Sequence, residues 1–136
     1  MRVTKCIILT HEHILELTNL AKQSFPKESC AFLLGTGENE VAVTDILPMR
    51  NADESMVSFS IEPKEILHVY EAAEKKNLQI AGIFHSHPAK PAPSSTDKRF
   101  MEINPVIWLI YSTIDGRFKA YIYDDNVREV DIKIKE

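Results

Sequence analysis

Short apolar segments alternate along this chain with segments of helical period, and this alternation restricts it to mixed α/β folds. Five apolar runs have the length of buried strands: residues 2–9, 29–35, 41–47, 79–84 and 106–112. Three further segments alternate apolar with polar side chains, as half-buried strands do: residues 57–61, 118–122 and 130–134. Together they predict a central mixed or antiparallel sheet of about eight strands.

Two long helices and one short helix are predicted between these strands. The first spans residues 11–24 and is stopped by Pro26, while the second starts at Pro63 and continues to Asn77. The short helix covers residues 96–103. The side chains expected to face the core are Ile14, Leu17 and Ala21 in the first helix and Ile66, Tyr70 and Ala73 in the second.

The composition favours one folded domain spanning residues 1–136. With 16 Lys+Arg against 20 Asp+Glu the formal charge is −4, so we expect neither a nucleic-acid nor a membrane partner. The longest apolar run, Val106–Tyr111, is too short to cross a bilayer, and no signal peptide fits the N-terminus. Cys6 and Cys30 make no C-x-x-C pair, which favours the reducing cytoplasm as the location.

The strongest chemical signal lies in His85-Ser86-His87-Pro88, followed by Asp97. Side chains two apart on a strand point to the same side, with Cα atoms roughly 6.6 Å apart, so both imidazoles can bind one ion while Ser86 faces away. Two histidines and one carboxylate leave the fourth tetrahedral position for water, as in catalytic zinc sites. Zinc would bring the pKa of that water to roughly 7 and polarise a substrate carbonyl. The sequence therefore predicts a zinc site made of His85, His87 and Asp97.

Spacing alone leaves a second role open for Asp97. Ser94-Ser95-Thr96-Asp97 has the pattern of a capping box, with Ser94 as N-cap and the acid three residues on. That role excludes metal ligation only if the carboxylate turns fully back to the backbone.

The other histidines carry weaker signals. His11-Glu12-His13 falls at a helix start, where residues two apart do not share a face, so we interpret it as solvated polar residues. His68 lies on a predicted helix with no second ligand nearby, which favours a surface or packing role.

A zinc-bound water needs a base, and Glu28 is the best local candidate because it follows Pro26 and immediately precedes an apolar strand. Judged by propensity alone, Glu28 is a solvated acid at a helix end. Other acids remain available for the role: Glu12, Glu38, Glu40 and Glu62.

The combined pattern resembles the JAMM/MPN (MPN+) zinc metalloprotease family. Deubiquitinases of that family carry a Glu upstream of H-[ST]-H-P and then Ser-x-x-Asp, matched here by Glu28, His85 to Pro88 and Ser94 to Asp97. The Phe59–Pro63 segment and the order of elements are also similar, so the resemblance covers nearly the whole chain. It implies one MPN-like (cytidine-deaminase-like) domain of the compact prokaryotic or archaeal type.

The resemblance also implies a role for each residue of the site. His85, His87 and Asp97 would ligate zinc, and Glu28 would act first as general base and then as acid. Ser94 would donate a hydrogen bond to the tetrahedral oxyanion. The implied reaction is hydrolysis of a peptide or isopeptide bond without a covalent intermediate.

Two departures from the family pattern stand out. The loop between His87 and Asp97 is one residue shorter than usual, which leaves Ser94 or Ser95 as the functional hydroxyl. Ser94 is favoured because it keeps the Ser-x-x-Asp spacing. Ala31 stands where the family commonly has Gly, a change that would narrow the approach of a substrate backbone.

The substrate implied by the resemblance is the C-terminal tail of a ubiquitin-like modifier or sulfur-carrier protein, added as an extended strand to a sheet edge beside the zinc. One alternative keeps the chemistry but releases a single C-terminal amino acid from a sulfur-carrier protein. Another is a non-catalytic scaffold of the same fold. The sequence leaves open the oligomeric state and the need for an activating partner.

Overall fold

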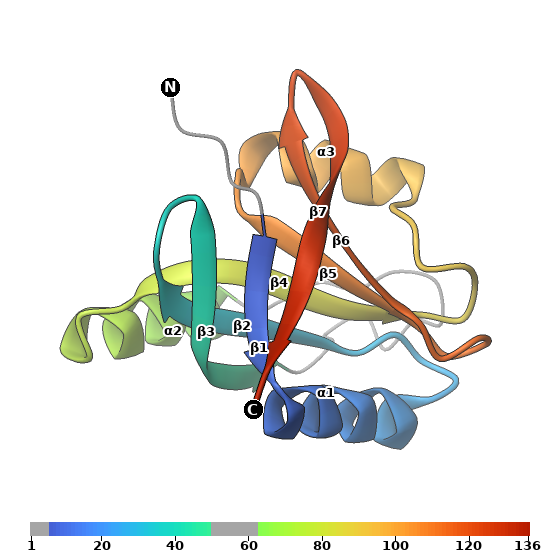
Figure 1. Cartoon of the computed structure of the whole chain (residues 1–136), viewed down its shortest axis with the longest axis horizontal. Coiled ribbons are helices and arrows are strands. Elements are labelled where there is room, and N and C mark those ends of the chain that lie inside the picture. Colours follow the sequence, from blue (N-terminus) through green and yellow to red (C-terminus); the bar gives the residue numbers. More distant parts are fainter. Residues whose placement is uncertain (1–5, 50–62) are drawn as a thin grey trace.

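A mixed sheet that closes into a barrel organises the fold (Figure 1). The computed structural model describes residues 6–49 and 63–136. Around the barrel the strands follow the order β1-β3-β2-β4-β5-β6-β7. Their bounds are β1 Cys6–Thr10, β2 Cys30–Thr36, β3 Glu40–Met49, β4 Gln79–His87, β5 Ile107–Ser112, β6 Phe118–Asp124 and β7 Asn126–Lys135. The expected strand over residues 57–61 and the first residues of the expected strand 2–9 lie outside the described residues.

Closure of the barrel depends on β1, which pairs in parallel with both β3 and β7. β2 lies antiparallel between β3 and β4, and β4 pairs in parallel with β5. The β5–β6 and β6–β7 pairs are antiparallel. The predicted class, a mixed α/β fold with two long helices and a shorter one, is confirmed, whereas closure of the sheet was not predicted.

The helices are arranged around the strands (Figure 1): α1 spans His11–Ser24, α2 Pro63–Lys75 and α3 Ser95–Ile103. Each of these helices is too short or too polar to cross a lipid bilayer, a statement that covers the described residues.

His13 corrects the expectation that His11-Glu12-His13 is simply solvated. Its Nδ1 accepts a hydrogen bond from Thr10 N–H at 3.1 Å, and Thr10 Oγ1 accepts from His13 N–H at 3.1 Å, which forms a capping box at the start of α1. Because Nδ1 accepts, Nε2 carries the proton and donates to the carbonyl of Thr44 at 3.2 Å. His13 therefore attaches the helix to β3, while His11 and Glu12 are exposed as expected.

The core consists of two clusters on opposite faces of the β2–β4 pair. One packs against Leu17 and Ala21 of α1 and includes Phe84. The other includes Ile83 together with residues of α2, α3 and β5: Val69, Ala73, Met101 and Trp108. Since side chains alternate along β4, His85 and His87 share the face of Ile83, and Ser86 shares the face of Phe84.

The buried face of α2 differs from the predicted one at one position. Val69 and Ala73 are buried, whereas Tyr70 is 59% exposed. Val69 and Ala73 are four residues apart and form the centre of the apolar face of α2, so Tyr70 lies at the edge of that face.

Candidate active site

The predicted metal ligands come from two neighbouring elements. His85 and His87 lie at the end of strand β4, and Asp97 lies in the first turn of α3. The loop between them contains prolines at 88, 91 and 93, which limit its freedom to move. His85, His87 and Asp97 are 0%, 6% and 5% exposed, so all three side chains are buried.

One oxygen of Asp97 faces both imidazoles. Oδ2 lies 3.4 Å from Nε2 of His85 and 3.1 Å from Nε2 of His87. The two imidazole rings meet edge to face, with centroids 4.4 Å apart. Ligand atoms bound tetrahedrally at 2.0–2.1 Å from a zinc ion are about 3.3 Å from one another, so this spacing fits such an ion.

The capping role of Asp97 coexists with this arrangement. Ser94 Oγ accepts from Asp97 N–H at 3.1 Å, and Asp97 Oδ2 accepts from Ser94 N–H at 2.8 Å. The capping box is thus complete, and the carboxylate still faces both histidines. The cap fixes the carboxylate where the two imidazoles converge.

Glu28 lies buried beside the same histidines, in the segment between α1 and β2. It is 4% exposed, and its Oε1 is 3.3 Å from His85 Nδ1. The interpretation of Glu28 as a solvated acid is therefore wrong. Ligand atoms of Glu28, His85 and His87 lie within 4.8 Å of one another, a cluster that could hold a metal ion. Of the other acids considered, Glu12, Glu38 and Glu40 are exposed, and Glu62 lies outside the described residues.

The two carboxylates determine the charge of His85. Burial lowers the pKa of this imidazole, but Asp97 and Glu28 outweigh burial and raise the pKa to about 9. For Asp97, burial raises the pKa, while the two histidines and Ser94 N–H bring it well below its ordinary range. Without a metal, the site therefore holds a protonated imidazole between carboxylates at neutral pH.

Contacts beyond the predicted residues support the site. The Trp108 ring meets His85 edge-on, with centroids 6.0 Å apart. Thr113 N–H and Oγ1–H donate to the carbonyl of His87 at 2.9 and 3.2 Å. Tyr121 O–H donates to the carbonyl of Pro91 at 2.8 Å, which attaches the loop to β6. No sequence motif indicated these contacts, because each joins residues that are distant along the chain.

Ala31 does not face the histidines. It is fully buried in the cluster on the α1 side of the sheet and pairs with Phe84. Its neighbour Cys30 pairs with His85 instead. The expected narrowing of the substrate approach by Ala31 is therefore wrong, because strand alternation turns its methyl group to the opposite face.

A convergent pair of imidazoles, a capped aspartate and a buried glutamate at one end of a mixed sheet is the arrangement expected of a metallopeptidase. The sequence matches the family described as prokaryotic homologs of the JAB domain over residues 10–123. The chain belongs to this family, which confirms the predicted JAMM/MPN membership.

Relatives with named activities are similar over most of the chain. The desampylase of Pyrococcus furiosus is 37% identical over 128 residues, which cover 93% of this chain and 89% of the relative. The desampylase of Haloferax volcanii is 33% identical over 113 residues, covering 81% and 80%. The CysO-cysteine peptidase of Mycobacterium tuberculosis is 30% identical over 121 residues, covering 85% and 82%. These relatives confirm the predicted enzyme class, a JAMM-type peptidase.

A solved structure also shares the fold. The solution structure of protein DSY2949 from Desulfitobacterium hafniense superposes with a TM-score of 0.84 at 34% sequence identity. The similarity covers 96% of this chain and 93% of that chain.

The raised pKa of His85 predicts a pH dependence of stability in metal-free protein. The folded-state pKa is about 9 against an ordinary value of 6.5, so the stabilisation is complete below pH 6.5 and lost as the pH rises through 9. We expect the Tm of EDTA-treated protein to fall across that window in thermal unfolding. The exposed-site variant His68→Gln should show the same fall. A fall no larger in wild type than in His85→Asn would contradict the assignment.

Proposed function

We propose that this chain is a zinc-dependent hydrolase that cleaves a peptide or isopeptide bond at the C-terminal tail of a ubiquitin-like modifier or sulfur-carrier protein. The observation that carries the proposal is the shared position of Asp97 Oδ2, within 3.4 Å of both Nε2 atoms, with buried Glu28 beside them. The named activities of the desampylase and CysO-cysteine peptidase relatives support the substrate class.

The chemistry of the donor set fits zinc, with His85, His87 and Asp97 as the residues that would hold the ion. Three protein ligands, made up of imidazole nitrogens and a carboxylate oxygen, are typical of catalytic rather than structural zinc sites. Bound there, zinc would lower the pKa of a water molecule to roughly 7 and polarise the carbonyl of the scissile bond.

Glu28 is proposed to move the proton. It takes a proton from the attacking water and later gives it to the leaving amine, so the carboxylate ends the cycle as it began. Two features of its position suit this role: burial excludes bulk water, and its carboxylate lies within 4.8 Å of ligand atoms of both histidines.

Ser94 is proposed to stabilise the oxyanion. As N-cap its Oγ accepts from Asp97 N–H, so the hydroxyl proton stays available for donation. The side chain of Ser94 is exposed and therefore accessible to a substrate carbonyl. Ser95 occupies the first position of α3 and has no capping role.

One edge of the sheet, formed by the second half of β3, ends close to the candidate site. β1 pairs with β3 only over residues 40–42, while β2 pairs with β3 over residues 42–49. Within the described residues, the stretch 43–49 of β3 therefore has a strand partner on one side only. Met49 lies opposite Cys30, and Cys30 lies opposite His85. An extended tail added to this edge would run toward the histidines.

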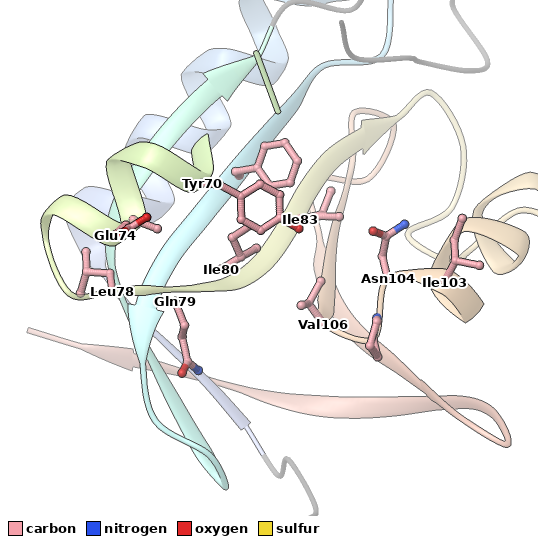
Figure 2. Close-up of a pocket in the computed structure, with 12 residues that line it drawn as sticks. Tyr70, Glu74, Leu78, Gln79, Ile80, Ile83, Ile103, Asn104 and Val106 are labelled. Carbon is pink, nitrogen blue, oxygen red and sulfur yellow. The ribbon is translucent and has the colours of Figure 1, made fainter. Parts of the chain in front are cut away.

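A pocket of ≈ 490 Å³ lies between α2, β4 and the end of α3 (Figure 2). Its wall includes Tyr70 from α2, Ile83 from β4 and Ile103 at the end of α3. Ile83 is two residues before His85, so this apolar pocket lies along the strand from the site. Such a surface favours a substrate with a folded body over a single amino acid.

The zinc assignment predicts about one zinc per chain in wild-type protein and its loss from His87→Ala, measured by elemental analysis after dialysis. His68→Gln should retain the metal, since that histidine lies on an exposed part of α2. Wild-type protein that stays free of zinc after reconstitution would leave Asp97 as a helix cap and favour the scaffold alternative.

Removal of the proposed base should slow turnover without loss of metal. We expect Glu28→Gln to lower kcat by about 10²–10⁴-fold, the usual size of acid–base assistance, with zinc content unchanged. Two substrates should be assayed in parallel: a ubiquitin-like protein joined to a lysine side chain, and the same protein with one extra C-terminal residue. Glu38→Gln, at an exposed position, is the matched control. Near-normal turnover by Glu28→Gln would remove Glu28 from the mechanism.

The two candidate hydroxyls can be separated by paired variants. We expect Ser94→Ala to lower kcat by roughly 10²–10³-fold, as loss of an oxyanion donor does. Ser94→Gly should lose as much activity, although glycine at an N-cap lowers helix stability by only about a few tenths of a kcal/mol. Loss of activity in this variant would therefore reflect the missing hydroxyl rather than a weakened helix. Ser95→Ala should be nearly normal. If Ser95→Ala is the damaging change, the assignment of Ser94 is wrong.

A further inference from the structure

Two buried serines connect the strand that carries the histidines to the segment that carries Glu28. Ser29 directly follows Glu28, and Ser86 lies between His85 and His87. They are 3% and 1% exposed. Ser86 Oγ accepts from Ser29 N–H at 2.9 Å and shares a second hydrogen bond with Ser29 Oγ at 2.8 Å. A third links Ser86 N–H to the carbonyl of Ser29 at 3.1 Å.

These bonds extend the β2–β4 pair beyond its last regular step. The ladder ends with Cys30 opposite His85, and β2 itself begins at Cys30. Past that point, the backbone N–H of Ser29 donates to a side-chain hydroxyl rather than to a carbonyl. The hydroxyl of Ser86 therefore replaces a backbone acceptor at the position where the chain leaves the sheet.

The Ser29–Ser86 contact lies on the opposite face of the sheet from the candidate metal ligands. Ser86 faces the α1 side of the sheet, while His85 and His87 face α2 and α3. Ser86 is therefore placed to influence the reaction through the backbone of Glu28 rather than by contact with substrate or metal.

We propose that Ser86, with Ser29 as its partner, is the positioning residue for the catalytic carboxylate of Glu28. The inference rests on the proposed function of Glu28 and extends it. Glu28 lies outside β2, so regular strand pairing does not hold its backbone. The Ser29–Ser86 bonds provide that restraint one residue away. Displacement of a catalytic group by about 1 Å can cost on the order of 10²-fold in rate.

The test compares steady-state kcat and KM for Ser86→Ala, Ser86→Thr and Ser29→Ala, each also in the Glu28→Gln background. Single-turnover rates are measured beside them to isolate the chemical step. We expect Ser86→Ala to lower kcat by about 10–100-fold, with KM within about threefold and zinc retained. Ser86→Thr keeps the hydroxyl and should restore most of kcat. Ser29→Ala keeps the Ser29 N–H bond to Ser86 and should lose less.

The effect of Ser86→Ala measured in the Glu28→Gln background distinguishes a positioning role from a merely structural one. If Ser86 acts through the carboxylate, adding Ser86→Ala to Glu28→Gln should cost less than about threefold more. Ser112→Ala is the matched control, because its buried hydroxyl also accepts backbone N–H groups, those of Ile114 and Asp115. This control should keep kcat within about threefold of wild type.

Three results would overturn the proposal. The first is a further 10–100-fold loss of kcat when Ser86→Ala is added to Glu28→Gln. The others are an equal loss of kcat in Ser112→Ala and loss of zinc from Ser86→Ala. If Ser86→Ala does not fold, the same comparison is made with Ser29→Ala. Full activity of Glu28→Gln would instead refute the proposed function. An inactive Glu28→Gln with a fully active Ser86→Ala would refute the positioning role alone.

Discussion

The site depends on one carboxylate oxygen at which a backbone N–H and two imidazoles meet. Asp97 Oδ2 accepts from the backbone of Ser94 and lies against Nε2 of both His85 and His87. These groups come from two elements, the start of α3 and the end of β4. Because the helix cap also holds the carboxylate, the local backbone of α3 as well as the histidines fixes its position.

Local sequence patterns predicted the parts of this site that local geometry determines. The H-x-H spacing placed two imidazoles on one side of a strand, and Ser-x-x-Asp placed a capped aspartate at a helix start. Both predictions follow from the regular spacing of side chains along a strand or a helix, which can be read from residue positions alone. The mixed α/β class followed from the same periodicity.

Features that depend on distant pairings could not be predicted in this way. Propensity assigned Glu28 to solvent, yet the antiparallel β2–β4 register brings it beside His85 and buries it. The contacts of Trp108 and Tyr121 likewise arise between separate strands. His13 was assigned to solvent because its partners, Thr10 and Thr44, become neighbours only when α1 meets β3. The position of Glu28 before an apolar strand, together with the family resemblance, indicated its role where propensity did not.

The pairing of β1 with β7 has a consequence for how the molecule forms. Cys6 lies opposite Asp131, so the contact that closes the barrel joins residues near the two ends of the described chain. Strand pairings of such long sequence separation form slowly, because a large loop must be ordered before the contact is gained. The strands that carry the site, β2, β4 and β5, pair among themselves without β1 or β7. During synthesis, the histidines and their strand neighbours therefore emerge and can pair while the barrel is still open, and β7 closes it last.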